Sequence, residues 1–330
     1  MANEPQYRHF KDQQTVLMLI AEIKQRYAFG YTTLTNKVIT QIKHYFQAQF
    51  PDADPTSGRS RFDNKKSPLI KPKLMLGLSG GIDSTVATYL AVKAVGKANV
   101  LAVSMPARPD DFQSLAHAKL VREALNLAVD NQGIPTIVDI SPIVQAHREA
   151  MNQTHIAELE LNAGHMMQNT EQRFRSGNFG SRIRVAILYD FKRAIRGRVL
   201  GTGNKTELCQ GYGTKYGTPL SYDFGLFDQL YKIDIYEMAK VLNVPQIIID
   251  TPPTTGYFEG QTHEGELGAS IEEQDIFAYL LFEKRLTPEE IKTKYGASLD
   301  FARLMQKRYE VSAHKRVLNE GQQCVTLEAR

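Results

Sequence analysis

LGLSGGIDSTV, residues 76–86, places a pair of glycines, two serines and an acid between an apolar run and an Ala/Val-rich segment. The apolar run, residues 73–79, predicts a short buried strand, and residues 85–95 predict a helix. Successive glycines let the backbone turn tightly and approach a ligand without Cβ clashes. Because a helix start presents free N–H groups and a positive dipole end, this turn is a candidate anion site.

Asp83 is the unusual residue of the turn, because an acid normally repels a phosphate. Its presence makes sense if a Mg²⁺ ion bridges the carboxylate and the phosphate, although Asp83 could also simply cap the following helix. The lysine of G-x-x-x-x-G-K-[ST] and the dinucleotide pattern G-x-G-x-x-G are both missing. The turn alone therefore leaves a phosphate site and a plain turn both open.

The segment that follows alternates between strand-like and helix-like patterns. Residues 99–105, 134–140 and 198–203 predict further strands, and Asp110 or Asp111 is expected to cap a helix through Leu127. Apolar strands separated by helices predict an α/β fold with a doubly wound, Rossmann-like parallel sheet flanked by helices. Ligands bind beyond the carboxyl ends of such strands, where Gly77 to Ser84 and Gly201 to Glu207 should both lie.

The remaining segments suggest how the chain is organised. Residues 15–50 have helical periodicity, whereas residues 51–72 gather Pro, Asp, Ser, Gly and basic residues and predict an exposed, mobile insertion. We therefore expect an N-terminal helical segment at 1–72 and a nucleotide-binding domain at 73–330 with a helical C-terminal part. Residues 250–268 are too long for a plain connector, so a lid is expected at 254–268.

Composition excludes several classes of protein. Among 330 residues, 40 Lys and Arg against 36 Asp and Glu give a net charge of +4, too mild to indicate a nucleic-acid partner. The two cysteines, Cys209 and Cys324, form no C-x-x-C pair, which argues against a disulfide framework or a zinc site. We see no signal peptide and no membrane span, so a cytoplasmic protein is expected.

S-G-G-x-D-S-T resembles the PP-loop of ATP pyrophosphatases, which cleave ATP between the α and β phosphates. Within that superfamily, four further stretches are similar to NAD synthetases. They are SGNFGSRIRVAILYDF (176–191), GTGNKTELCQGYGTKYG (201–217), PPTTGYFEGQTHEGELGASIEEQDIFAYL (252–280) and KRYEVSAHKR (307–316). The resemblance implies the adenine nucleotide alpha-hydrolase-like fold.

It also implies a reaction. Such enzymes amidate the nicotinate carboxylate of deamido-NAD⁺, using ATP and Mg²⁺, through an adenylate intermediate with release of pyrophosphate and AMP. The residues before the turn contain no cysteine and are too few for a glutaminase domain, so free ammonia is the expected nitrogen donor. Related enzymes are homodimers, and a dimer is expected here by resemblance.

The resemblance also assigns site residues. Those matched to ATP are Gly77, Leu78, Ser79, Gly80, Gly81, Ile82, Asp83, Ser84, Thr202, Lys232 and Thr254. Asp83 and Glu207 match the magnesium ligands. Those matched to deamido-NAD⁺ are Arg182, Lys215, Asp223, His314 and Lys315. Asp83, Lys215 and Asp223 are the expected catalytic residues.

Two positions depart from the family pattern. Thr218 stands where these enzymes usually have an aspartate, and Ser104 stands where bacterial relatives often have an arginine that contacts ATP. Arg108 is a candidate substitute for that arginine. Two other functions stay open at this point: another PP-loop reaction, such as GMP-synthetase-like amidation or tRNA thiolation, and a nucleotide-binding scaffold without activity.

Overall fold

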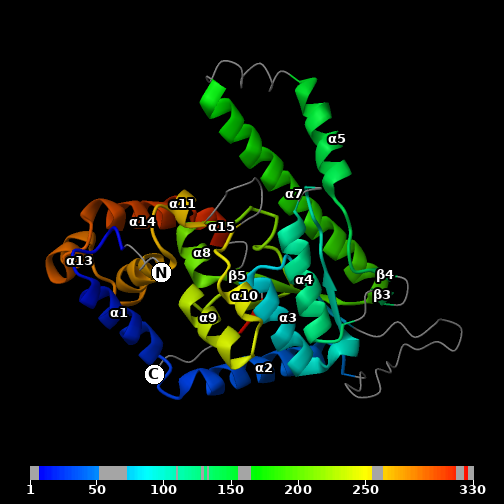
Figure 1. Cartoon of the computed structure of the whole chain (residues 1–330), viewed down its shortest axis with the longest axis horizontal. Helices are drawn as coiled ribbons and strands as arrows, with labels where there is room; N and C mark the ends of the chain where they lie inside the picture. The colour runs from blue at the N-terminus through cyan, green and yellow to red at the C-terminus, as the bar shows by residue number, and fades with distance from the viewer. Residues whose placement is uncertain are drawn as a thin grey trace, which may run out of the picture.

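A computed structural model of the chain shows a central sheet with helices on both faces (Figure 1). The structure describes residues 7–51, 73–108, 111–127, 130–131, 134–154, 165–254, 263–316 and 323–325. Nearly all of the expected insertion at 51–72 and the middle of the expected lid at 254–268 lie outside the described residues.

The main sheet contains five parallel strands in the order β2-β1-β5-β6-β7. Their bounds are Leu74–Gly77 for β1, Val100–Val103 for β2, Arg198–Asn204 for β5, Phe224–Phe227 for β6 and Gln323–Cys324 for β7. Leu74 in β1 pairs with Val100 on one side and Arg198 on the other. Strands covered on both faces must be apolar throughout, and β2 and β6 are buried along their whole length. The predicted parallel α/β sheet is confirmed.

One face of the sheet is covered by four helices that share a core with the strands. They are α2 (Gly30–Gln49), α3 (Ile82–Val95), α4 (Phe112–Ala124) and α9 (Lys232–Val241). Val86 and Leu90 of α3 pack in this core with Phe46 of α2 and Met238 of α9. Because α3 is buried on nearly every side, the turn that precedes it is fixed by the body of the protein.

The opposite face is covered by α5 (Ser141–Asn152) and α7 (His165–Ile195). Leu188 and Ile195 of α7 pack against Met75 and Val199 of the sheet. The amino-terminal part of α7 extends beyond the body of the protein together with α5 (Figure 1).

A third core lies beside the sheet and is built from helices. They are α1 (Gln13–Gln25), α8 (Lys205–Gln210), α12 (Ile271–Ala278), the π-helical turn η2 (Tyr279–Glu283), α13 (Pro288–Tyr295) and α14 (Leu299–Val311). The shorter elements are η1 (Lys97–Asn99), β3 (Asp130–Asn131), β4 (Ile134–Pro135), α10 (Gln246–Ile249), α11 (His263–Leu267) and α15 (Ala313–Arg316). Within the described residues, no helix combines the length and apolarity of a membrane span.

The strand predicted at 134–140 was wrong. Only Ile134–Pro135 is extended, as β4, and it pairs antiparallel with β3 rather than with the main sheet. Further along, Ile137 makes one isolated bridge to Ser104 at the end of β2. Proline has no N–H to donate to a ladder, which confines it to the margins of sheets.

Two predicted helix boundaries also differ from the structure. The helix expected to begin at Thr85 starts at Ile82, so Asp83 lies in its first turn and does not cap it. Next, α4 ends at Ala124 rather than Leu127, and the Asp111 side chain before it makes no capping hydrogen bond.

A buried ion pair joins the N-terminal helices to the start of α9. Arg26, which follows α1, donates to Asp234 Oδ2 at 2.6 Å and to Glu283 Oε1 at 3.0 Å. Tyr31 of α2 donates to the other Asp234 oxygen at 2.8 Å. The Asp234 side chain is fully buried, and burial raises its pKa although Arg26 opposes that shift. Arg26 therefore compensates the buried negative charge of Asp234.

Removing the guanidinium should destabilise the fold. Arg26→Met leaves a buried carboxylate without its cation, which should lower the free energy of unfolding by about 3–5 kcal/mol. The control is Arg303→Met, because Arg303 pairs with Glu289 on the surface, where ion pairs contribute little. Urea unfolding measures both variants. Equal unfolding midpoints for the two would show that the Arg26 pair is not an anchor.

Candidate active site

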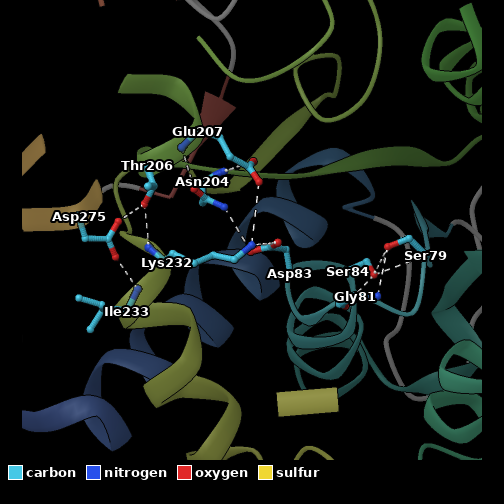
Figure 2. Close-up of polar contacts among 10 residues, drawn as sticks. All are labelled: Ser79, Gly81, Asp83, Ser84, Asn204, Thr206, Glu207, Lys232, Ile233 and Asp275. Carbon is cyan, nitrogen blue, oxygen red and sulfur yellow. Dashed lines mark hydrogen bonds and ion pairs between the residues drawn. The ribbon is translucent and has the colours of Figure 1, made fainter. Parts of the chain in front are cut away.

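The turn between β1 and α3 lies at the carboxyl edge of the sheet. Gly80 has a φ of +85°, and a Cβ at this position would lie 2.2 Å from the carbonyl oxygen of Ser114. Ser84 Oγ accepts from the Ser79 N–H at 3.2 Å and donates to the Gly81 carbonyl at 3.0 Å, as Figure 2 shows. The turn is thus held by its own serines next to the N–H groups that a helix start leaves unpaired.

A cavity of about 240 Å³ opens in front of this turn. Residues 77–84 all line it, and so do Thr202, Glu207 and Thr254 from the other segments. The sequence-based set for ATP is therefore brought together around one cavity, with the exception of Lys232, which does not line it.

Lys232 connects the two predicted metal ligands. Its side chain is only 3% exposed, its Nζ donates to Asp83, and it lies 4.0 Å from Glu207 Oε1 (Figure 2). Asn204, at the end of β5, donates from Nδ2 to Asp83 Oδ1 at 3.3 Å, while its Oδ1 caps α8 by accepting from the Glu207 N–H at 3.0 Å. Three elements, α3, α8 and α9, thus converge on one charge cluster: Asp83, Glu207 and Lys232.

The charge cluster contains two carboxyl groups and one ammonium group. Burial raises the pKa of Glu207 well above its ordinary value, and the nearby Asp83 carboxylate adds to that shift while Lys232 opposes it. Burial also disfavours the charged form of Lys232, but Asp83 and Glu207 raise its pKa overall. One ammonium therefore faces two carboxyl groups, and the raised pKa of Glu207 favours its neutral form.

The residues present fit a Mg²⁺ ion that substrate phosphates would help to hold. No group of three or more His, Cys, Asp or Glu side chains gathers anywhere in the described part of the chain, so an all-protein metal cage is not found there. Mg²⁺ is usually bound by one or two carboxylates together with phosphates and waters. Asp83 and Glu207 both line the cavity, and the Lys232 ammonium already marks a place for positive charge.

Some cavity residues were not predicted from the sequence. Arg184 of α7 lines the cavity and donates from Nε to the Met105 carbonyl at 3.0 Å. His263 of α11 also lines it, and burial together with the charge of Lys232 lowers its pKa to about 3, so the imidazole is neutral. Arg184 belongs to the Arg-x-Arg pattern of the sequence, but only its first arginine, Arg182, was selected.

The residues matched to the dinucleotide gather elsewhere, around the loop 211–217. Arg182 donates from Nε to the Lys215 carbonyl at 3.2 Å. Lys315 of α15 donates to the carbonyls of Gly211 and Gly213 at 2.6 and 2.8 Å. His314 is exposed, and its ring Nδ1 lies within hydrogen-bond distance of the Val311 carbonyl. None of these side chains lines the cavity.

Asp223 was predicted to bind the dinucleotide and to act in catalysis, and the structure shows its partners within the chain. Its carboxylate accepts from Lys192 Nζ at 2.7 Å and from the Val199 N–H at 2.8 Å, and it does not line the cavity. These bonds tie α7 to the start of β5. Its predicted roles in binding deamido-NAD⁺ and in catalysis stay predictions.

The two residues that depart from the family pattern, Thr218 and Ser104, both make hydrogen bonds within the structure. Thr218 accepts a hydrogen bond from Ser181 Oγ at its carbonyl oxygen, 2.8 Å away. Ser104 donates to the Leu78 carbonyl at 2.7 Å and accepts from the buried guanidinium of Arg122 at 2.9 Å. Ser104 thus supports the strand end that leads into the glycine turn.

Comparisons with known proteins agree with this architecture. Residues 65–319 match the family model described as NAD synthase. The NH₃-dependent NAD⁺ synthetase of Methanocaldococcus jannaschii is 37% identical over 247 residues, which is 74% of this chain and 86% of the relative. The same-named protein of Chlorobium phaeovibrioides is 39% identical over 233 residues, 71% of this chain and 76% of the relative. The NH₃-dependent NAD synthetase of Campylobacter jejuni, solved with nitrate, has a TM-score of 0.58 at 26% identity, covering 86% of this chain and 96% of that one.

The backbone of the glycine turn allows a direct test. Gly80→Ala forces a Cβ against the Ser114 carbonyl at a positive φ, and should lower the free energy of unfolding by about 2 kcal/mol. Gly81→Ala is the matched control, because Gly81 has a φ of −78° and a Cβ there would meet only the Ser79 hydroxyl at 3.5 Å. Urea unfolding of both variants measures the difference. Equal stabilities would mean that the turn is not constrained as described.

Proposed function

The chain belongs to the NAD synthase family, and on that premise we propose that it amidates deamido-NAD⁺ with ammonia to form NAD⁺ while ATP is split into AMP and pyrophosphate. The observation that carries this proposal is the charge cluster of Asp83, Glu207 and Lys232, whose two acids line the same cavity as the glycine turn. A dinucleotide carboxylate and a triphosphate are both anionic, so their reaction requires a site that compensates negative charge.

The reaction has two steps in this proposal. A carboxylate has no leaving group, so an oxygen of the nicotinate carboxylate first attacks the α-phosphorus of ATP, and the bond to the β,γ-pyrophosphate breaks. Ammonia then attacks the carbonyl carbon of the resulting acyl-adenylate, loses a proton, and AMP leaves with the C–O bonding pair. Catalysis of both steps rests mainly on positioning and electrostatics.

Each part of the cavity has a proposed role. The turn from Gly77 to Ser84 binds the departing phosphates through its N–H and hydroxyl groups, and Thr202 and Thr254 contact the nucleotide. Asp83 and Glu207 would hold the Mg²⁺, which would supply charge neutralisation on the phosphates. When that ion binds, Lys232 is no longer required to neutralise Asp83, and its ammonium can turn to a phosphate oxygen.

We propose that deamido-NAD⁺ is bound by Arg182, Lys215, Asp223, His314 and Lys315, with Lys215 facing its diphosphate. We also propose a homodimer in the cytoplasm. The extension of α7 and α5 beyond the body supports a partner (Figure 1), since it carries the partly exposed apolar side chains of Ile143 and Phe174.

The proposal is tested by incubating the protein with ATP, Mg²⁺, ammonium and deamido-NAD⁺. NAD⁺, AMP and pyrophosphate should form in equal amounts, and omission of deamido-NAD⁺ should stop AMP formation. Other PP-loop acceptors are not favoured by the relatives, so XMP and tRNA should neither be consumed nor raise the melting temperature in the presence of ATP. Absence of NAD⁺ in this assay would refute the proposed function.

A single substitution tests the charge cluster. Asp83→Asn keeps the shape of the side chain but removes one of the two carboxylates, and kcat should fall at least about 100-fold. Asp12→Asn is the control, because Asp12 only caps α1 and Asn caps helices equally well. Circular dichroism verifies that both variants fold. A near-normal kcat for Asp83→Asn would remove Asp83 from the reaction.

A further inference from the structure

A buried carboxylate outside the cavity joins the two helices that carry Glu207 and Lys232. Asp275 of α12 is 0% exposed. Its Oδ2 accepts from the Ile233 N–H at 2.8 Å, and its Oδ1 accepts from the hydroxyl of Thr206 (Figure 2). Thr206 directly precedes Glu207, and Ile233 directly follows Lys232. Asp275 therefore contacts both helix starts one residue away from the charge cluster.

The Thr206 hydroxyl completes this connection. Its oxygen accepts from the Lys232 N–H at 3.0 Å. A hydroxyl has one hydrogen to donate and lone pairs to accept with, so donation to Asp275 leaves a lone pair for Lys232. The carboxylate thus fixes the orientation of Thr206, and Thr206 in turn holds the backbone of Lys232.

The two hydrogen bonds provide acceptors for N–H groups at the start of α9. The first N–H groups of a helix have no intrahelical acceptor, and those of Lys232 and Ile233 lie in the first turn of α9. Asp275 satisfies one directly and the other through Thr206, which itself lies in the first turn of α8. The starts of α8 and α9 are thereby held at one separation.

Stability alone does not account for an acid at this position. Asp275 lies between Gln274 and Ile276, both buried, and burial raises its pKa to about 7 even though Thr206 and Ile233 lower it. Well-packed apolar residues often replace buried charges without loss of stability. The distance between Glu207 and Lys232, by contrast, decides how their charges act on a phosphate, and displacements near 1 Å can cost about 100-fold in rate.

We propose that Asp275 is a positioning residue, which sets the separation of Glu207 and Lys232 by clamping α8 to α9 through Thr206. The proposal rests on the proposed function for its effect on catalysis. Its effect on binding does not, because Mn²⁺ and ATP can be titrated without the second substrate.

The experiment compares Asp275→Asn and Thr206→Val with two controls. In Asp275→Asn the amide oxygen can still accept from Ile233, but the amide nitrogen faces Thr206, whose hydroxyl loses its acceptor. Thr206→Val removes the hydroxyl that donates to Asp275. Thr206→Ser keeps it. Glu273→Gln is the same acid-to-amide change on the same helix, at a buried residue that hydrogen-bonds with His9 and Ser270, away from the charge cluster.

Three quantities are measured on the full chain: kcat for NAD⁺ formation, the Kd of ATP with Mn²⁺ by calorimetry, and the melting temperature. Asp275→Asn and Thr206→Val should each lower kcat and weaken binding about 10-fold or more, as loss of supporting hydrogen bonds does at metal sites. Thr206→Ser and Glu273→Gln should stay near wild type in both. The double variant Asp275→Asn with Thr206→Val should lose no more activity and affinity than the more impaired single variant, because both substitutions remove the same connection.

The proposal is overturned if Asp275→Asn lowers the melting temperature while kcat and Kd stay at wild-type values, which is the signature of a merely structural acid. Additive losses in the double variant would overturn it as well. If Asp275→Asn does not fold, Thr206→Val against Thr206→Ser decides the question. A wild-type protein that binds ATP with Mn²⁺ but forms no NAD⁺ would refute the proposed function alone.

Discussion

The site depends on one electrostatic constraint: the ammonium of Lys232 lies between the carboxylates of Asp83 and Glu207 in a nearly solvent-free position. None of the three groups is adjacent in sequence to another. Each stands in the first turn of a different helix, α3, α8 or α9. Of these helices, α8 begins directly after β5, and α3 and α9 each begin five positions after the end of a strand. A parallel sheet brings such ends together, so the sheet is what makes the cluster possible.

Buried polar groups around the charge cluster hold its helices in place. Asn204 fixes Asp83 and caps α8, Asp234 secures α9 to Arg26, and Asp275 connects the two helix starts. Buried acids of this kind are expensive to desolvate. Their concentration around α8 and α9, rather than elsewhere in the sheet, fits a site in which geometry matters more than maximal stability.

The sequence revealed the parts of this arrangement that have local causes. The glycine pair after an apolar run predicted the turn, and the alternating pattern predicted the parallel sheet. The apolar run of 134–140 was misleading because Pro135 has no N–H to donate, and the strand ends there after pairing with β3 rather than with the main sheet. The four residues of β6 are too few for a clear period. Lys232 and Asp275 resemble ordinary helix-surface residues in sequence, since their partners lie 149 and 69 residues away and only the fold brings them together. Asp223 was assigned by resemblance. Its hydrogen bonds to Lys192 and Val199 could not be predicted from the local sequence, because these partners lie 31 and 24 residues away.

The most direct measurement of the central claim is anomalous diffraction at the manganese edge from crystals grown with Mn²⁺ and an ATP analogue that cannot be cleaved between the α and β phosphates. The account predicts one manganese peak within coordination distance of both Asp83 and Glu207, with the Lys232 ammonium released from Asp83 and directed at a phosphate oxygen. A structure with nucleotide in the cavity, no metal at the two acids and Lys232 still bonded to Asp83 would contradict it.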